Sequence, residues 1–555
     1  MAVPIPQSDV CTQGPGSSWT PDLRSPVLAS NRPLADSGRS GHDDPLKTYP
    51  WLPAPMTTKV IPSHPNLPPP PALAFRKPHP QSRSLALLVL TSLLSVFGVV
   101  SVSAAAPRPH IVYIVSDDQG WKDVGYHGSD IKTPALDTLA ATGARLEQFY
   151  AQPMCTPTRA CLMTGRYPFR YGLQTLVIPS GHTYGLPTDE WLLPQALKAA
   201  GYTTAIVGKW HLGHADKKFW PRQRGFDYQY GPLIGEIDYF THEQHHVIDW
   251  YRNNKKVKEK GYSTTLLGND AVRLIEQHEP ATPLYLYLTF NSPHTPYQAP
   301  KEYLDRYVHI ADPSRRAYAA SITAMDDQIA RVIDALERKG MRRQTLIMFQ
   351  SDNGGTRNAM FAGEGDMSKV KIPCDNGPYR EGKGSLYEGG TRVCALANWP
   401  GQIPAGTVVN ALMHVVDVYP TLAGLAGASL AQCKPLDGVD MWPTLSEGRP
   451  SPRTEMVYNI EAFRAALRKD DWKLIWRAPI PSIPELYNLA QDPSEKNNLA
   501  ASHPEIVTTL QKRINELAAG MAKSPLLEAE FKAMMVRLAT PPAFPGEEFE
   551  FNVEP

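Results

Sequence analysis

The sequence predicts an α/β domain with a large, mostly parallel or mixed sheet flanked by helices, followed by a smaller C-terminal α+β domain that contains an antiparallel sheet. From Pro107 onward, apolar runs rich in Val, Ile, Tyr and Leu alternate with helical patterns, and Pro or Gly separates them. Such alternation is typical of a parallel sheet with crossover helices. Near Ser451 the pattern changes to short strands and turns. A chain of 555 residues is also too long for one small core.

The first 106 residues predict a leader. Residues 1–83 are rich in Pro and Ser and lack apolar periodicity, which indicates disorder. Residues 84–106 carry no charge and follow Arg76, Lys77 and Arg83, so they are either a signal peptide or a membrane anchor. In both cases the basic flank predicts that the chain after Pro107 is exported, whether periplasmic, secreted or anchored with this part outside the cytoplasm.

Residues 107–450 contain the patterns of the large α/β domain. The strand patterns are short apolar runs, and the longest helical pattern carries apolar residues along one face. Strands are expected at 111–115, 204–207, 284–290 and 345–349, and helices at 133–142, 190–200 and 315–338.

Residues 451–523 predict a second, mainly structural domain. Its strands are expected at 457–460, 465–468, 472–476 and 486–489, and the amphipathic segment 506–521 is expected to cover one face of their sheet. We interpret residues 524–555, which become acidic and contain Pro after Ala539, as an extended tail.

Charge and cysteine content restrict the function. A net charge of +1 gives no sign of a nucleic acid partner, so attraction for an anionic substrate must arise locally. Six cysteines are too few for a disulfide scaffold. Apart from Cys11 and Cys155, the other four allow up to two bridges, whose pairing stays open.

A polar cluster follows each of the four predicted strands of the large sheet. Ligands of open α/β sheets bind outside the carboxyl ends of the strands, so these clusters are expected to meet. In chain order the clusters contain Asp117 and Asp118, Lys209 and His211, His294, and Asp352 and Asn353.

Four of these residues predict a metal site. Asp117, Asp118, Asp352 and Asn353 offer only oxygen ligands, which calcium prefers, with magnesium as the second choice. Zinc would be expected to use His or Cys. A single Asp-Asp pair after a strand is more often a cap or a solvated turn, but two such pairs at two strand ends favour a metal.

Local charge also favours a metal. Three aspartates would repel an anionic substrate. A dication together with Arg159, Lys209 and Lys383 gives five positive charges against three negative ones. The surplus would attract the anion and stabilise charge in a transition state.

Cys155 begins the run Cys-Thr-Pro-Thr-Arg, and Thr164-Gly165-Arg166 closes the same segment. A lone cysteine is more often a small buried hydrophobe. Here Pro157 is placed near a helix start, which puts Cys155 at the electropositive end of that helix.

His211 and His294 are candidates for proton transfer because imidazole titrates near neutral pH, although a lone histidine near a strand end is usually structural. Lys383 lies in the glycine-rich run 381–390, which permits close approach of a ligand.

Together these motifs resemble the type I sulfatases, and among them most the arylsulfatase B branch, which removes the 4-sulfate from N-acetylgalactosamine. The resemblance extends from about His110 to about Ala500 and implies an alkaline-phosphatase-like fold. It is carried by the segments 116–120, 155–166, 201–213, 224–227 and 486–499.

The resemblance implies roles for individual residues. A formylglycine-generating or other maturation enzyme would oxidise Cys155 to formylglycine, and one calcium ion would be held by the modified residue with the four oxygen ligands named above. Arg159 and Lys209 would steady the formylglycine hydrate. His211 would take the proton that lets sulfate leave, and Lys383 and His294 would grip the sulfate and protonate the leaving alcohol.

The predicted function is therefore hydrolysis of sulfate monoesters on a sulfated carbohydrate or an aryl sulfate. Residues 357–375 form a longer segment than in arylsulfatase B, so the substrate is open. Two alternatives remain: a phosphomonoester or phosphonate hydrolase of the same superfamily, and a glycan-binding homologue without catalysis.

Overall fold

The computed structural model describes residues 108–357, 372–478 and 481–539. The large sheet runs in the order β13-β2-β12-β11-β1-β10-β4-β5-β8-β9. Its centre is parallel, because β1 pairs in parallel with β10 and β11, and β10, β4 and β5 continue in the same direction. Antiparallel pairs lie on both sides of this centre, so the sheet is mixed, as predicted.

All four predicted strands of this sheet are present, each within two residues of its predicted ends. The ten strands are β1 (His110–Ser116), β2 (Ala144–Leu146), β4 (Thr203–Gly208), β5 (Tyr228–Gly231), β8 (Tyr251–Arg252), β9 (Lys255–Lys256), β10 (Leu284–Thr289), β11 (Thr345–Ser351), β12 (Ala395–Asn398) and β13 (Thr407–Val409). Short pairs are formed by β3 (Phe149–Tyr150) with β14 (Met413–His414) and by β6 (Glu243–Gln244) with β7 (Val247–Ile248).

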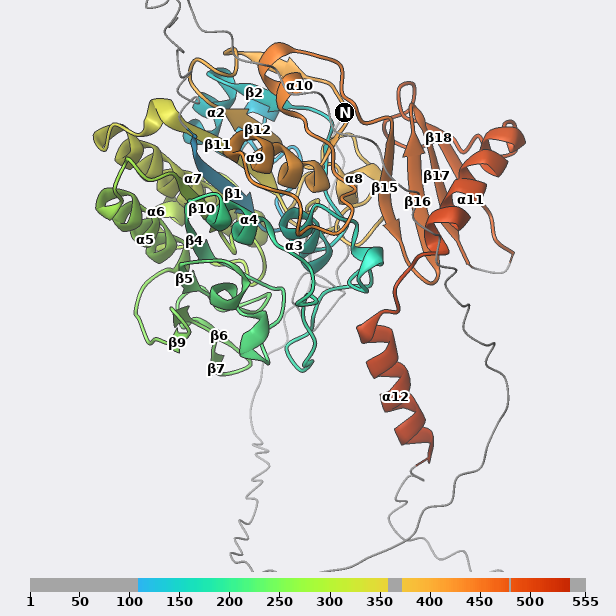
Figure 1. Cartoon of the computed structure of the whole chain (residues 1–555), viewed down its shortest axis with the longest axis horizontal. Helices are drawn as coiled ribbons and strands as arrows, with labels where there is room; N and C mark the ends of the chain where they lie inside the picture. The colour runs from blue at the N-terminus through green and yellow to red at the C-terminus, as the bar shows by residue number, and fades with distance from the viewer. Residues whose placement is uncertain (1–107, 358–371, 479–480, 540–555) are drawn as a thin grey trace, which may run out of the picture. The chain divides into compact units, whose positions relative to one another are not determined.

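Both faces of the sheet are covered, which explains why its central strands read as nearly continuous apolar runs. Along β1, Ile111 and Tyr113 enter one apolar cluster, whereas Val112 and Ile114 enter the other. Figure 1 shows the helices on the two faces. One cluster includes α3 (Cys155–Thr164), α4 (Leu193–Ala199) and α9 (Val418–Ala426), and the other includes α2 (Pro134–Ala141), α5 (Ser263–Gln277) and α7 (Pro313–Arg338). The shorter helices are α6 (Lys301–Leu304), α8 (Glu388–Thr391) and α10 (Trp442–Glu447).

Helix α7 confirms the predicted apolar face, since Ile322, Met325 and Ile329 are fully buried. It begins at Pro313, two residues earlier than predicted, because the Asp312 side chain accepts a hydrogen bond from the Arg315 backbone N–H at 2.8 Å and caps the helix.

Asp326 of α7 is buried and caps a second helix. Its two carboxylate oxygens accept hydrogen bonds from the backbone N–H groups of Ala135 and Leu136, both at 2.9 Å, at the start of α2. Burial, opposed by these two hydrogen bonds, raises the pKa of Asp326 to about 7. The helix α2 therefore depends on one residue almost 200 positions away.

Replacing Asp326 with alanine is expected to lower the free energy of unfolding by about 1–3 kcal/mol, because two buried N–H groups lose their acceptor. Urea unfolding of the two proteins measures the difference. Asp334→Ala, at an exposed position on the same helix, is the matched control and should stay within about 0.5 kcal/mol of the parent. Equal effects of the two substitutions would contradict the capping role.

The predicted C-terminal sheet is confirmed. Strands β15 (Glu455–Ile460), β16 (Arg464–Lys469), β17 (Trp472–Arg477) and β18 (Glu485–Asn488) form an antiparallel sheet in chain order. Helix α11 (Pro504–Ala518) packs against β16 and β17, as expected for the amphipathic segment.

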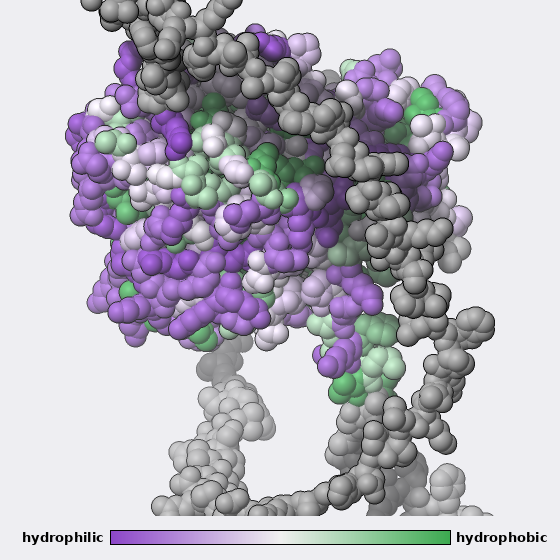
Figure 2. All heavy atoms as spheres, in the orientation of Figure 1, coloured by the Kyte–Doolittle hydropathy of each residue, from purple (hydrophilic) through white to green (hydrophobic). Residues whose placement is uncertain are grey.

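The expectation of an extended tail from residue 524 is wrong for its first part. Residues Pro525–Ala539 form helix α12. Figure 2 shows apolar side chains gathered on the part of α12 that is visible, and Phe531 and Met535 are largely exposed. The segment lacks a clear polar face, which is why periodicity did not reveal the helix.

Some predictions lie outside the described residues, among them the disordered leader 1–83, the signal or anchor 84–106 and the end after Ala539. Among the helices that the structure describes, none combines the length and the apolar composition needed to cross a bilayer. The five described cysteines are all free, so no bridge joins them. The described residues belong to one compact unit, and the domain boundaries stay predictions.

Candidate active site

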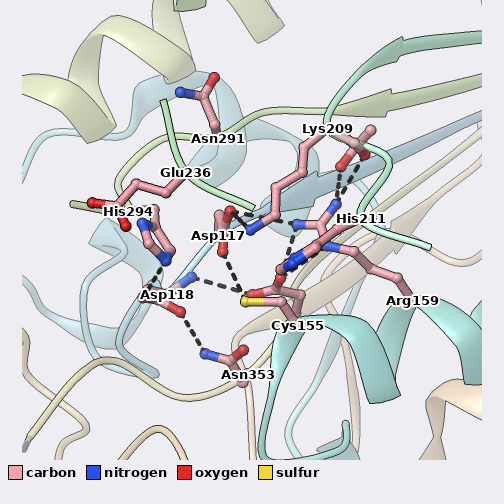
Figure 3. A network of polar contacts seen from close by, with 12 residues as sticks. Asp117, Asp118, Cys155, Arg159, Lys209, His211, Glu236, Asn291, His294 and Asn353 are labelled. Atoms are coloured by element: carbon pink, nitrogen blue, oxygen red, sulfur yellow. Dashed lines mark hydrogen bonds and ion pairs between the residues drawn. The ribbon is translucent and has the colours of Figure 1, made fainter. Parts of the chain in front are cut away.

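The predicted strand ends meet at one edge of the sheet. Strands β11, β1, β10 and β4 are consecutive parallel neighbours, so the residues after their carboxyl ends lie side by side. The side chains at these ends are buried. Figure 3 shows Asp117, Asp118, Cys155 and Asn353 gathered together, with Arg159, Lys209 and His211 to one side and His294 to the other.

Cys155 is the first residue of α3, where backbone N–H groups have no helical partner and favour an anion. Pro157 lies in the first turn, as predicted. The Cys155 Sγ donates a hydrogen bond to Asp117 Oδ1 at 3.4 Å. Burial, and then the carboxylate of Asp352, raise the pKa of the thiol well above its ordinary value. The unmodified side chain is therefore held as a protonated thiol, which is a poor nucleophile.

Asp118 lies between two polar partners. Its Oδ2 accepts a hydrogen bond from Lys383 Nζ at 2.7 Å, and its Oδ1 accepts one from Asn353 Nδ2 at 2.8 Å. Burial alone would raise the pKa of Asp118, but Lys383 and His294 outweigh it and hold that pKa well below its ordinary value. Asp118 has a φ of 64°, a left-handed conformation that costs about 1–3 kcal/mol and clusters at functional sites.

Lys383 and His294 share one hydrogen bond. Lys383 Nζ donates to His294 Nε2 at 3.1 Å, and His294 Nδ1 donates to the Thr295 carbonyl oxygen at 2.8 Å. Because lysine has only donors, His294 is neutral and Nε2 is its bare acceptor. Burial, followed by Lys383, lowers the pKa of His294 to about 4. Lys383 is therefore the partner that holds a proton.

Arg159 and Lys209 neutralise the other two carboxylates. Arg159 donates to Asp352 Oδ2 from Nε at 3.1 Å and from Nη2 at 2.8 Å. Lys209 forms an ion pair with Asp117, which also lies 3.7 Å from Arg159 Nη2. Burial, and then Asp117, raise the pKa of Asp352 above its ordinary value although Arg159 opposes them. Three cations thus face three carboxylates before any metal is counted.

His211 is a buried neutral base. Its Nε2 donates to the Ile178 carbonyl oxygen at 3.2 Å, and its Nδ1 has no hydrogen-bond partner within the described residues. Burial, followed by Lys209 and Arg159, lowers the pKa of His211 well below its ordinary value. His211 has a φ of 59°. Gly235 packs on the ring so closely that a Cβ there would lie 2.4 Å from His211 Cε1.

A cavity of about 270 Å³ opens onto this cluster. Cys155, His211, His294 and Lys383 line it. Four of the six predicted catalytic side chains therefore face one space that is large enough for a small acidic group, whereas Arg159 and Lys209 are not part of its lining.

Three nearby residues were not predicted. Glu236 lines the cavity and accepts a hydrogen bond from Thr295 Oγ1 at 3.3 Å. Asn291 has a buried Nδ2 without a partner in the described chain, and Thr356 Oγ1 lies 3.4 Å from Asp118 Oδ2. Glu236 follows β5, a four-residue parallel strand that is too short to stand out as an apolar run. The available signal was the position of Glu236 after β5, the fifth strand of the parallel centre.

The donor set fits a hard cation. Asp117, Asp118 and Asp352 supply carboxylates, and Asn353 Oδ1 is a buried acceptor without a hydrogen-bond partner in the described ranges. Ligand atoms of Asp117, Asp118, Cys155 and His294 lie within 4.8 Å of one another. This group holds two of the three predicted carboxylates, which calcium or magnesium would take, and it adds His294. Asp352 lies outside the group, although its Oδ1 accepts a hydrogen bond from the Asp118 backbone N–H at 3.2 Å.

The chain matches two family models. The sulfatase model matches residues 109–428, and the model for the C-terminal part of N-sulphoglucosamine sulphohydrolase matches residues 381–520. Arylsulfatase J of Mus musculus is 36% identical over 469 residues, which cover 75% of this chain and 76% of the relative. N-acetylgalactosamine-6-sulfatase of Rattus norvegicus is 33% identical over 392 residues, with 67% and 72% covered. The arylsulfatase B branch stays a prediction.

Solved structures support the same assignment. The structure of Ps i-CgsB in complex with k-i-k-neocarrahexaose has a TM-score of 0.70 and 32% identity, and covers 79% of this chain and 98% of that one. A phosphonate monoester hydrolase of Agrobacterium radiobacter, at 20% identity and a TM-score of 0.52 with 74% and 96% covered, shares the fold alone. The predicted alkaline-phosphatase-like fold is confirmed. The chain belongs to the sulfatase family, whose members are sulfuric ester hydrolases.

Proposed function

We propose that this sulfatase acts on sulfated glycans, using a formylglycine at position 155 and one calcium ion. The observation that carries the proposal is the position of Cys155. It starts a buried helix, contacts Asp117 and lies among three cations and three carboxylates. An unmodified thiol in that position is held protonated. Oxidation of the side chain by a maturation enzyme would replace the weak nucleophile with an aldehyde.

The hydrated aldehyde would supply the hydroxyl that attacks the sulfur of the sulfate ester, which divides hydrolysis into two easier steps. Arg159 is paired with Asp352, and Lys209 is paired with Asp117. Both cations would stabilise the negative charge that develops on that hydroxyl. The other hydroxyl of the hydrate would then give its proton to His211 Nδ1, the ring nitrogen that has no hydrogen-bond partner in the described chain. Loss of that proton would let sulfate leave and the aldehyde re-form.

Lys383 and His294 would bind the sulfate and serve the leaving alcohol. Both line the cavity, and Lys383 donates to His294. Because His294 carries no proton on Nε2, the proton for the departing alcohol comes from Lys383, directly or through His294. Lys383 and His294 together would therefore act as the general acid.

Calcium would be held by Asp117, Asp118, Asp352 and Asn353, together with the modified Cys155. When bound, it would neutralise charge on the sulfate oxygens. The three carboxylates are already balanced by Arg159, Lys209 and Lys383, so a dication leaves a local surplus of two positive charges. That surplus favours an anionic substrate.

The substrate class rests on the relatives. One relative is named N-acetylgalactosamine-6-sulfatase, and one similar structure is a complex with a neocarrahexaose. We propose a sulfated N-acetylgalactosamine or similar unit for this chain, and the choice of the 4-sulfate rests on the sequence resemblance alone. Phosphomonoester hydrolysis is the second candidate, favoured only by the fold shared with the phosphonate hydrolase.

Protein made in its native host is expected to release sulfate from defined sulfated disaccharides at least about tenfold faster than phosphate from matched phosphate esters. The expectation follows from the formylglycine chemistry. Ion chromatography of both anions measures it. The Cys155 peptide from the same sample should contain the aldehyde by mass spectrometry, whereas the Cys161 thiol should be unchanged. A preference for phosphate, or an active protein with only thiol at Cys155, would contradict the proposal.

A further inference from the structure

A second and larger cavity, about 880 Å³, adjoins the catalytic pocket. The two cavities share Leu176 and Lys383 in their linings. One wall of the larger cavity is the loop around Lys383. The other wall comes from the C-terminal sheet, at the turn between β15 and β16 and at the end of β17. We name it the arginine groove, after Arg380, Arg464 and Arg477, which line it with Phe463.

The groove is electropositive. Its lining contains five basic side chains and two carboxylates. Glu485 lies behind the lining, 3.7 Å from Arg380 and 3.8 Å from Arg477, and removes one charge of the surplus. Lys383, one of the five basic side chains, is already paired with Asp118, so one positive charge remains in the groove. A cleft lined by one sign of charge concentrates ligands of the other sign.

The three arginines are not equivalent. The guanidinium of Arg464 already makes three hydrogen bonds within the protein. Its Nε and Nη2 donate to Glu461 at 3.0 and 2.7 Å, and its Nη1 donates to the Gly384 carbonyl oxygen at 2.6 Å. Arg380 Nη1 donates to the Tyr487 hydroxyl and to the Glu495 carbonyl oxygen, both at 3.1 Å. Arg477 makes the long ion pair to Glu485 and lies 5.2 Å from the centre of the Tyr387 ring, and 42% of its side chain is exposed. Its guanidinium is therefore the group with the most capacity for an external anion.

An apolar surface lies beside these charges. Phe463 is 69% exposed and precedes Arg464 in the turn, and Leu176 at the junction of the two cavities is 44% exposed. A large exposed aromatic side chain on a cavity wall marks a binding surface. A sugar ring offers an apolar face for Phe463, and anionic groups on its rim would meet Arg477 and Arg380.

We infer that the arginine groove binds the neighbouring unit of an anionic oligosaccharide while the sulfate to be removed lies at Lys383. This inference rests on the proposed function and adds a second anion subsite, for a carboxylate or a sulfate on the adjacent sugar. Arg477 and Arg380 hold the anion, and Phe463 packs against the ring. The enzyme then prefers an oligosaccharide with two anionic groups to a small aryl sulfate.

The test compares Phe463→Ala, Arg477→Ala and the parent on three substrates: 4-nitrophenyl sulfate, a singly sulfated disaccharide with a neutral neighbour, and disaccharides whose neighbour carries a carboxylate or a second sulfate. Arg477→Ala is expected to lower kcat/KM about tenfold for the doubly anionic substrates, mainly through KM. The effect on 4-nitrophenyl sulfate should be less than twofold. The preferred anion, carboxylate or sulfate, is the one on the disaccharide for which Arg477→Ala lowers kcat/KM more. Lys512→Ala, which removes an exposed charge on α11, is the control.

Equal losses on all substrates, or none, would overturn the inference while leaving the proposed function intact. If the parent releases sulfate from no substrate, the proposed function fails. In that case a binding measurement tests the arginine groove. A doubly anionic disaccharide should bind Cys155→Ala protein about tenfold more tightly than Cys155→Ala/Arg477→Ala protein in calorimetry, and equal affinities would overturn the groove on their own.

Discussion

Cys155→Ala protein is expected to hydrolyse sulfate esters at least about 10⁴-fold more slowly than the parent, measured as kcat/KM, because alanine removes the side chain that we propose as the covalent nucleophile. The side chain lost is small and makes one weak hydrogen bond, to Asp117. The thermal midpoint should therefore change by only a few degrees, and the activity loss cannot be attributed to unfolding.

Cys161→Ala is the matched control. Cys161 lies six residues further along α3 and is equally buried, and its side chain contacts that of Tyr171, which is not a site residue. Its variant should keep its activity within about threefold of the parent. If Cys155→Ala protein retained more than about a hundredth of the parent activity, another group would have to be the nucleophile.

Lys473→Met is expected to lower the free energy of unfolding by about 3–5 kcal/mol, because the buried Glu495 loses its cation and the buried Glu388 keeps only the longer ion pair to Arg392, at 3.8 Å. Lys473 Nζ lies 3.0 Å from Glu388 Oε1 and 2.8 Å from Glu495 Oε1, and all three side chains are fully buried. The ammonium also lies 3.7 Å from the centre of the Tyr458 ring. Burial raises the pKa of Glu495 to about 7, with Lys473 opposing it. At Glu388 burial is outweighed by Lys473, Arg392 and Arg468 together, which lower the pKa to about 2.

Urea unfolding monitored by tryptophan fluorescence measures this change, with Lys469→Met at an exposed position of the neighbouring strand as the control. The control should differ from the parent by less than about 0.5 kcal/mol. A Lys473→Met protein within about 1 kcal/mol of the parent would show that the buried network contributes little to stability.

The central strands, and the meeting of the polar residues that follow them, could be predicted from the sequence because they depend on local patterns. Parallel strands buried on both faces are continuous apolar runs, and Asp117, Lys209 and Asp352 directly follow such runs. The resemblance then supplied roles that spacing alone does not give. Short strands such as β5, with the residue Glu236 that follows it, lack that signal.

Pairings between distant residues could not be predicted. Asp326 caps α2, and Lys473 joins Glu388 to Glu495, but nothing near any of these residues specifies its partner. Such contacts arise only when the tertiary structure brings buried charges together. Helix α12 was missed for the opposite reason, because its exposed apolar side chains give no two-faced pattern.

Lys383 belongs by position to the large domain, yet its loop is fastened to the C-terminal sheet. Arg464 of β16 holds the Gly384 carbonyl oxygen, and Lys473 of β17 holds Glu388 at the far end of the same loop. The C-terminal family model likewise begins ahead of Lys383. Anyone who builds chimeras from two relatives should therefore place the crossover upstream of residue 380. A junction near 450 would separate Lys383, which we propose to bind the sulfate, from the sheet that keeps its loop in place.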